Sequence, residues 1–370
     1  MQNNKPLNTF SISRFIGEEA YGGIFLIIAT IAALFWANSS FYHSYHYIWH
    51  ELQVGIVWGD VNLVSSMHHW INDGLMALFF FTVGLEIKRE VMGGELSTMK
   101  KASMPIAAAV GGMLIPASIY ALININNPEL IHGWGIPMAT DIAFALGLLA
   151  LLGKRVNINL KIFLTALAIA DDLGAVMVIA LFYTDTIIIN ELLTATFFLG
   201  VSKPNNQSLL TDEQAHIISD IEELNLQAQT PLQKLEHSMH PITSFFILPI
   251  FALSNAGVHI EGSIMDMLFH PISLGIIGGL VLGKFLGISL FSRLMVWLKI
   301  SVLPKGVSWS QIYGVAFLAG IGFTMSMFIS DLAFTEDEHK QIAKVGIMAA
   351  SFISATIGML WLVFETNNKK

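Results

Sequence analysis

Two adjacent carboxylates, Asp171 and Asp172, stand in the middle of the apolar run ALAIADDLGAVMVIALF. This run belongs to a stretch, residues 160–183, that is long enough to cross the hydrocarbon core of a bilayer. Removal from water disfavours the charged form of a carboxylate, so each Asp needs a cation, a proton or a partner charge. The pair therefore indicates ion and proton chemistry inside a membrane. The alternative is a structural ion pair between packed helices.

The composition agrees with a membrane setting. Of the 370 residues, 54% are hydrophobic and only 12% are charged, and the mean hydropathy is +0.64. A soluble domain carries roughly 25% charged residues, so the chain is expected to be an all-α polytopic membrane protein. About ten stretches approach or exceed the roughly 20 apolar residues that span a bilayer. They are residues 17–36, 68–87, 103–124, 133–152, 160–183, 187–201, 242–259, 270–298, 312–334 and 342–364.

Fourteen basic residues fall on one side of the expected spans. They are Lys5, Arg14, Lys88, Arg89, Lys100, Lys101, Lys154, Arg155, Lys161, Lys203, Lys234, Arg293, Lys299 and Lys305. The opposite loops 38–67 and 124–133 contain no Lys or Arg. The positive-inside rule then places both termini in the cytoplasm and requires an even number of spans. No cleaved signal is expected, because the first apolar stretch lacks an obvious small-residue cleavage site.

Two segments break the membrane pattern. Residues 202–240 are polar, with a Lys, Glu and His cluster near the end, which is typical of a cytoplasmic linker between two membrane halves. Residues 54–63 (VGIVWGDVNL) alternate apolar side chains around a Gly-Asp pair, which predicts a β-hairpin. A free hairpin edge favours pairing with a second copy of the chain, as a homodimer. The alternative is a loop that packs on its own helices.

Several other classes of protein are disfavoured. The chain has no cysteine, which excludes disulfides and thiolate metal sites, and its net charge of −8 argues against a nucleic-acid partner. Intramembrane aspartyl proteases need their two Asp on facing helices, whereas Asp171 and Asp172 are neighbours about 100° apart on one helix. The run GGLVLGK lacks the Ser or Thr of a phosphate loop, since Phe285 follows its lysine.

Two of the apolar stretches contain helix-breaking residues at mid-depth. The breaks fall at Pro137, Thr140 and Asp141 in one stretch and at Gly320 and Gly322 in the other. Broken helices are tolerated at membrane depth only where they face protein or a cavity, and their ends carry partial charges. Asp141 and the buried Lys284 have the signs needed to neutralise such ends. A simple N-cap is the alternative for Asp141.

The segments FFFTVGLEIKRE, ATDIAFALGLLALLGKR, ALAIADDLGA, LEHSMHP, LGKFLGISLF and GIGFTMSMFI follow in this order. Together they closely resemble the NhaA-type sodium/proton antiporters of bacterial inner membranes, over nearly the whole chain from about Gly22 to Leu362. The resemblance implies two inverted repeats whose broken helices cross at mid-membrane. It also implies a single membrane domain with an ion-transporting core (residues 102–183 and 270–364) and an interface bundle (17–101 and 187–259) that includes the linker 202–240.

The resemblance assigns roles to the intramembrane residues. Asp172 matches the primary ligand of sodium and protons, and Asp171 matches its neighbour in the ion-binding pair. Lys284 matches a buried lysine that pairs with the Asp171 position when sodium is absent. Thr140 and Asp141 match ion-binding residues at the broken helix. No enzymatic activity and no cofactor are implied, since Na⁺, Li⁺ and H⁺ are transported ions.

Further residues are matched outside this centre. Asp73, in WINDGLMALFF, corresponds to another membrane carboxylate near the ion pathway. The cluster that the resemblance associates with pH activation consists of Glu86, Arg89, Glu90, Glu236, His237 and His240. The alternative is that this group is only a solvated rim at the cytoplasmic face of the membrane.

The chain departs from the family after Phe198, where about two further spans are expected but the sequence continues as LGVSKPNN. The remaining stretch 187–201 carries Glu191 and, at about 1.5 Å per residue, covers roughly 22 Å of a core about 30 Å thick. Phe285, after Lys284, also replaces a common proline. The expected function is export of sodium or lithium in exchange for entering protons, with pH control. The alternative is a transport-deficient or regulatory remnant of such an antiporter.

Overall fold

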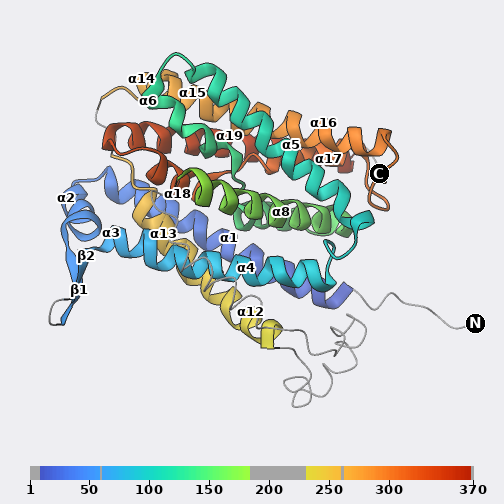
Figure 1. The fold of residues 1–370 in the computed structure, drawn as a ribbon, viewed down its shortest axis with the longest axis horizontal. Coiled ribbons are helices and arrows are strands. Elements are labelled where there is room, and N and C mark those ends of the chain that lie inside the picture. Colours follow the sequence, from blue (N-terminus) through green and yellow to red (C-terminus); the bar gives the residue numbers. More distant parts are fainter. Residues whose placement is uncertain (1–8, 59–60, 184–230, 260–261, 368–370) are drawn as a thin grey trace, which may run out of the picture.

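The computed structural model describes residues 9–58, 61–183, 231–259 and 262–367. Long helices lie side by side along the long axis of the molecule, and a small hairpin projects at one end (Figure 1). The longest single helices are α1 (Thr9–Ala37), α4 (Met76–Gly93), α5 (Met99–Asn124), α8 (Ile158–Phe182), α16 (Lys284–Trp297) and α19 (Asp337–Asn367).

Shorter elements extend or connect these helices. The α-helical ones are α2 (Tyr42–His46), α3 (Met67–His69), α6 (Pro128–Ile131), α7 (Ile142–Leu151), α12 (Pro231–Ile242), α13 (Leu248–Asn255), α14 (Ile264–Phe269), α15 (Pro271–Ile277), α17 (Trp309–Leu318) and α18 (Phe323–Ala333). The 3₁₀ segments are η3 (His132–Met138) and η4 (Gly153–Arg155). The π-helical segments are η1 (Tyr47–Glu51), η2 (Trp70–Leu75), η5 (Thr243–Ile247) and η6 (Gly278–Gly283).

Five of the continuous helical segments are long and apolar enough to cross a membrane. They are Met67–Gly93, Met99–Asn124, Ile158–Phe182, Pro271–Trp297 and Asp337–Thr366. Two bent pairs raise the number to seven among the described residues, and Tyr21–Ala37 is a shorter apolar helix. A mostly helical membrane protein is therefore confirmed. Ten spans are not confirmed, and the expected stretch 187–201 lies outside the described residues.

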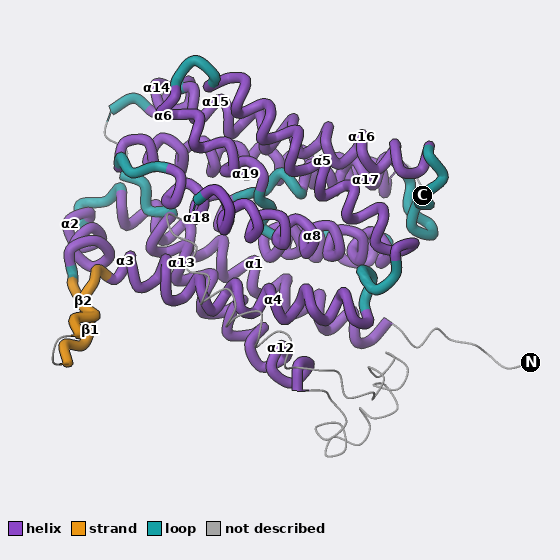
Figure 2. Tube along the Cα trace, in the orientation of Figure 1, coloured by secondary structure: helices purple, strands orange, loops and turns teal. Residues whose placement is uncertain are grey.

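The two bent pairs occupy the positions that the sequence marks as broken. The segment Pro128–Met138 meets Ile142–Leu151 at 44°, and Trp309–Leu318 meets Phe323–Ala333 at 47°. Figure 2 shows the short loop segments that interrupt the helices in the middle of the bundle. The prediction of broken helices around Asp141 and Gly320 is confirmed, whereas the inverted symmetry of two repeats stays a prediction.

The hairpin is also confirmed. Strands β1 (Gln53–Trp58) and β2 (Val61–Ser66) pair antiparallel, with Trp58 opposite Val61. The predicted Gly-Asp turn lies outside the described residues. The same holds for most of the expected linker 202–240, of which only the part that begins at Pro231 is described, as helix α12.

Helices α5 and α16 approach each other closely beside the centre of the bundle. A Cβ atom on Gly111 would overlap the carbonyl oxygen of Gly287, and one on Gly287 would overlap that of Gly111. Only glycine permits such backbone contact. Two residues before Gly287, Phe285 continues α16 and stacks on Phe317, with ring centroids 4.3 Å apart. This packing fixes where Lys284 enters the bundle.

Candidate functional site

The centre of the site is a buried Lys–Asp pair. Asp171 and Asp172 project from α8 with 2% and 3% of their surface exposed, and Lys284 projects from α16 with 1% exposed. The Lys284 ammonium donates to Asp171 Oδ2 at 2.6 Å. The structure thus brings together the two residues that the sequence analysis expects to pair. Lys284 directly follows the π segment η6, an irregularity that is frequent at functional sites.

Asp171 and Asp172 each have a buried Oδ1 atom that receives no hydrogen bond within the described part of the chain. The Lys284 ammonium is bonded to Asp171 Oδ2. A buried carboxylate oxygen without a donor costs free energy unless a cation or proton satisfies it. Asp172 therefore has the free acceptor capacity that an exchangeable cation requires.

Asp141 joins the two broken helices. Its Oδ1 accepts from the Phe144 amide at 2.9 Å, so Asp141 is the N-cap of α7. Its Oδ2 accepts from the amide and the hydroxyl of Thr324, at 3.1 and 2.6 Å, in the first turn of α18. One carboxylate thus neutralises the positive ends of two helices. The N-cap alternative for Asp141 is therefore observed, together with a second contact that the sequence did not predict.

Thr140 makes the complementary contact at a carboxyl-terminal helix end. Its hydroxyl donates to the Ala319 carbonyl at 2.8 Å, directly after α17, and the Asp141 amide donates to the Ile321 carbonyl at 2.6 Å. These carbonyls would otherwise lack partners where the helix stops. The two breaks consequently contact each other.

A cavity of about 10 Å³ lies between Asp172 and the breaks. It is lined by Phe79, Thr140, Asp141, Ile142, Ala143, Asp172, Leu248, Thr324 and Met325. This is about the smallest volume that can hold a single water molecule. Carboxylate and hydroxyl oxygens are the donors that a hard cation prefers. The lining offers two carboxylates, Asp141 and Asp172, and two hydroxyls, Thr140 and Thr324.

The other predicted residues lie apart from this cavity. The Asp73 side chain is 63% exposed and pairs with His69 at 3.3 Å, so the structure does not bring Asp73 to the Asp171–Asp172 pair. Arg89 forms ion pairs with three carboxylates of the expected pH cluster: Glu236 at 2.9 Å, Glu90 at 3.1 Å and Glu86 at 4.0 Å. The two remaining members of that cluster lie on α12, where His237 is exposed and His240 is half-buried.

The sequence analysis missed residues that the structure places in polar networks. Thr324 closes the cavity and binds Asp141, and Asp331 forms a buried pair with Lys344 at 3.2 Å. The signal was present, since Asp331 and Lys344 are ionisable residues inside apolar stretches. Thr324 lies directly after the Gly320–Gly322 break.

Three curated relatives of similar sequence identity to this chain share one name. The "Na(+)/H(+) antiporter NhaA" of Acidithiobacillus ferrooxidans is 44% identical over 96% of this chain and 98% of the relative. Those of Helicobacter pylori strain 26695 (43%; 96% and 95%) and Oleidesulfovibrio alaskensis (42%; 94% and 92%) are comparable. These alignments extend over 428, 421 and 416 positions, more than the 370 residues of the chain. Each relative therefore contains residues without a counterpart here.

The sequence model of the family described as "Na+/H+ antiporter 1" matches in two segments, residues 13–218 and 209–362. Together the two segments cover nearly the entire chain. The polar connection between the membrane halves is where they meet. The chain belongs to the Na+/H+ antiporter 1 family.

Proposed function

We propose that this protein exchanges sodium ions for protons across the bacterial inner membrane. The observation that carries the proposal is the buried Asp172 carboxylate, which has a free oxygen beside a cavity of single-ion size lined by Asp141, Thr140 and Thr324. The curated relatives named above are antiporters and not enzymes. Sodium and lithium share this oxygen chemistry, and both are proposed substrates.

Competition for the same carboxylates supplies the coupling. A proton on Asp172 removes the negative charge that sodium needs, and bound sodium prevents protonation. Lys284 adds a second exchangeable charge, because a cation that draws Asp171 away leaves the lysine without its partner. The titrations of the three groups are therefore coupled, and the protons belong to the cluster rather than to one residue.

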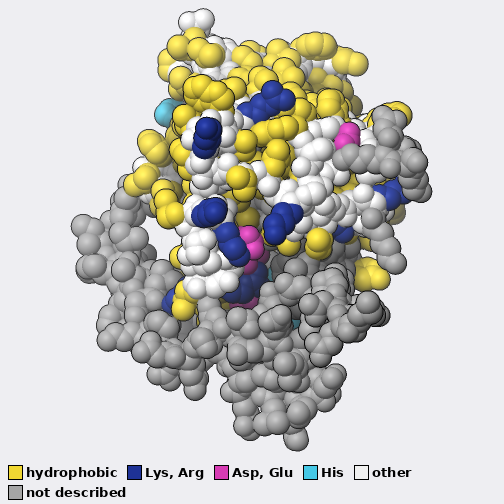
Figure 3. Space-filling view, turned by 90° about the vertical axis from the view of Figure 1, so that its right-hand side faces the viewer, with side chains coloured by type: hydrophobic (Ala, Val, Ile, Leu, Met, Phe, Trp, Pro, Cys, Tyr) yellow, Lys and Arg dark blue, Asp and Glu magenta, His cyan; other side chains and the backbone are white. Residues whose placement is uncertain are grey.

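The charge distribution supports an orientation of the chain in the membrane. Basic side chains gather on the end of the molecule where α1 begins and α19 ends, as Figure 3 shows for the view onto that end. The loops at the hairpin end, residues 38–67 and 124–133, contain no Lys or Arg. The positive-inside rule supports cytoplasmic termini and an extracellular hairpin. In this orientation, the downhill entry of protons into the cell drives sodium out.

Alternating access requires one group of helices to move against another. We assign the moving core to residues 102–183 and 270–364, and the static bundle to 17–101 and 187–259, as the resemblance implies. The cavity supports this division, because it is lined from the core by Asp172 and Thr324 and from the other bundle by Phe79 and Leu248.

The Arg89 cluster is a candidate for pH control, since it joins α4 to α12 through a part-buried hydrogen bond from Arg89 to Glu236. Protonation of the carboxylates around Arg89 weakens this tie and frees α12. The hairpin of residues 54–63 leaves strand edges that a second copy of the chain would cover in a homodimer. Both roles stay predictions.

The second candidate function is a transport-deficient or regulatory remnant. One observation favours it: the alignment with a relative is longer than the chain. The relative therefore contains sequence that this protein lacks. The missing segments would belong to the static bundle, so the ion site itself is retained.

Exchange is measured in everted membrane vesicles with a pH-sensitive dye. Addition of sodium is expected to dequench the dye in vesicles that contain the chain and not in vesicles that contain Asp172→Asn at the same level. Equal dequenching by the two proteins would overturn the proposed site. If the parent does not dequench the dye but still binds sodium, and Asp172→Asn does not bind it, the remnant function is supported instead.

A further inference from the structure

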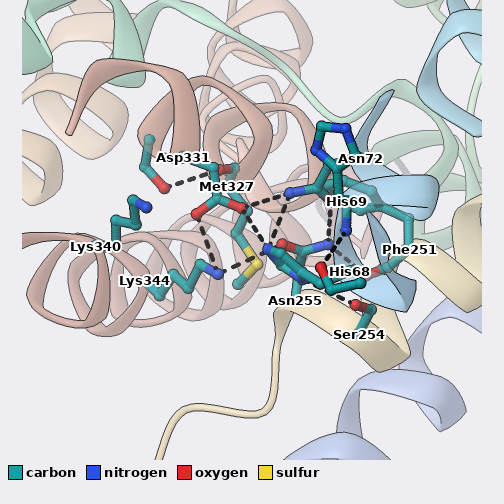
Figure 4. Close-up of polar contacts among 12 residues, drawn as sticks. His68, His69, Asn72, Phe251, Ser254, Asn255, Met327, Asp331, Lys340 and Lys344 are labelled. Atoms are coloured by element: carbon teal, nitrogen blue, oxygen red, sulfur yellow. Dashed lines mark hydrogen bonds and ion pairs between the residues drawn. The ribbon is translucent and has the colours of Figure 1, made fainter. Parts of the chain in front are cut away.

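A buried polar cluster at the hairpin end takes no part in the proposed ion site (Figure 4). Asp331 on α18 and Lys344 on α19 have largely buried side chains and form an ion pair of 3.2 Å. Two side chains from the helix that leads into α4 reach the same carboxylate. Asn72 Nδ2 donates to Asp331 Oδ2 at 2.9 Å, and His68 Nε2 lies 3.6 Å from that oxygen.

Helix α13 completes the cluster. Asn255 donates to Asn72 Oδ1 at 2.9 Å and accepts from Lys344 at 3.4 Å, and His68 Nδ1 lies 3.1 Å from Ser254 Oγ. The cluster therefore spans the boundary across which the proposed core and static bundle move. Asn72 lies in the π segment η2, where the altered helical spacing turns it toward Asp331.

The cluster lies outward from the ion site along one helix. Thr324, which binds Asp141, and Asp331 are seven residues apart on α18, about 10 Å along the axis. Phe328 lies between them and contacts Phe80 of α4 and Phe251 of α13, with ring centroids 5.3 and 6.4 Å apart. An ion that leaves the cavity toward the hairpin must separate α18 from α4 and α13, first at this aromatic layer and then at Asp331.

The charges are distributed so that such a separation is reversible. Asp331 and Lys344 both belong to the proposed core, so the ion pair moves as a unit and neither charge is left uncompensated. The contacts that cross the boundary come from the side chains of His68, Asn72 and Asn255. Hydrogen bonds of this kind exchange for water at a modest net cost.

We propose that His68 and Asn72, by binding Asp331, form an outer latch that holds the hairpin side of the ion pathway closed and releases when that side opens. The latch deepens the proposed function and depends on it, since it assumes that the core turns against the static bundle. Its positioning residues contact neither sodium nor the Asp171–Asp172 pair.

The chain has no cysteine, so a single introduced thiol reports accessibility without background. Met325 borders the cavity and is buried, and Met325→Cys serves as the reporter. A membrane-impermeant thiol reagent is applied to intact cells, with Ile56→Cys on the exposed hairpin as the marker that the reagent reaches that side. In the reporter background, His68→Ala/Asn72→Ala is expected to raise the labelling rate of Met325→Cys about tenfold, because breaking the latch populates the outward-open state.

The matched control is His69→Ala, which removes an exposed histidine on the same turn that pairs only with the exposed Asp73 among the described ion pairs. It is expected to label like the parent, and His68→Gln, which keeps a hydrogen-bond donor, is expected to restore most of the closure. If the double variant does not fold, His68→Ala and Asn72→Ala are measured singly, each with a smaller rise.

The latch and the proposed exchange have separate readouts. The latch is overturned if the labelling rate is unchanged in the double variant and in both single variants. If the parent also shows sodium-dependent dequenching, the exchange function is left intact. A parent without exchange whose labelling still rises on removal of His68 and Asn72 would overturn the exchange function, while the closure itself is supported.

Discussion

At the scale of single residues, the carboxylates of Asp141 and Asp172 make different contacts. Asp141 accepts three hydrogen bonds from α7 and α18 and thereby holds the broken helices together. Asp172 keeps an oxygen free beside the cavity. The sequence could not separate an ion ligand from an N-cap at Asp141, because Thr324, the residue that decides it, lies 183 positions away along the chain. Adjacent carboxylates, by contrast, are visible in the sequence.

Substitution of the free carboxylate tests this distinction. Asp172→Asn keeps the shape of the side chain but can neither take up a proton nor neutralise sodium, so exchange is expected to disappear at every pH. The measurement is sodium-driven proton movement in proteoliposomes, with the amount of folded protein determined by size exclusion. Exchange by the variant at a rate near that of the parent would remove Asp172 from the centre of the mechanism.

The lysine partner is predicted to matter for stability. Lys284→Ala leaves the Asp171 carboxylate buried without a counter-charge, which is expected to lower the free energy of unfolding by about 3–5 kcal/mol. Thermal unfolding in detergent provides the measurement. Lys101→Ala is the control, because Lys101 pairs with Glu95 at an exposed position and should change the melting temperature little. Equal melting temperatures for parent and Lys284→Ala would mean that the buried pair is not coupled.

A histidine outside the membrane spans predicts acid sensitivity. Desolvation by the atoms packed around its ring, which keeps an exposed edge, lowers the pKa of His50 from 6.5 to about 4, and the charges of His68, Lys344 and His46 act in the same direction. Because the folded-state pKa is depressed, the neutral form stabilises the fold above pH 6.5, and this contribution is lost as the pH falls toward 4. His50→Gln is therefore expected to show a smaller drop in melting temperature between pH 7 and pH 5 than the parent. An identical drop in the two proteins would assign the acid sensitivity to other groups.

At the scale of helices, local sequence predicted where the bundle breaks but not how the breaks are held. Pro137, Gly320 and Gly322 weaken helices through their own backbone properties, so their effect can be read locally. The contacts of Thr140 with the Ala319 carbonyl and of Asn72 with Asp331 join segments far apart in the chain. Such pairings depend on the packing of whole helices, which periodicity does not encode.

The close contact of α5 and α16 gives a prediction for one helix pair. Gly287→Ala places a methyl group against the Gly111 carbonyl, which forces the helices apart and is expected to cost about 1–3 kcal/mol. Gly84→Ala is the matched control: no atom lies within 4 Å of the added Cβ, and the alanine should stabilise α4 by about 0.5–1 kcal/mol. Melting temperatures that change equally in both variants would contradict the close approach.

At the scale of the molecule, the ion site and the scaffold are separable. All residues that line the cavity come from described helices, namely α4, α7, α13, α18, α8 and the break before α7. The relatives contain residues without a counterpart in the chain, and the resemblance places this difference after Phe198, in the proposed static bundle. We therefore expect the site to be retained and the proposed static bundle to be smaller than in the relatives.

Restoring that surface is the test at this scale. A two-span segment taken from a relative and inserted after Phe198 is expected to raise both the melting temperature in detergent and the rate of sodium/proton exchange, because longer apolar spans replace the short stretch 187–201 with its Glu191. A polar insertion of the same length is the control and should raise neither. If the unmodified chain already equals a full-length relative in exchange rate and stability under the same conditions, that result would show that the missing spans are dispensable. The proposed static bundle would then be complete without them.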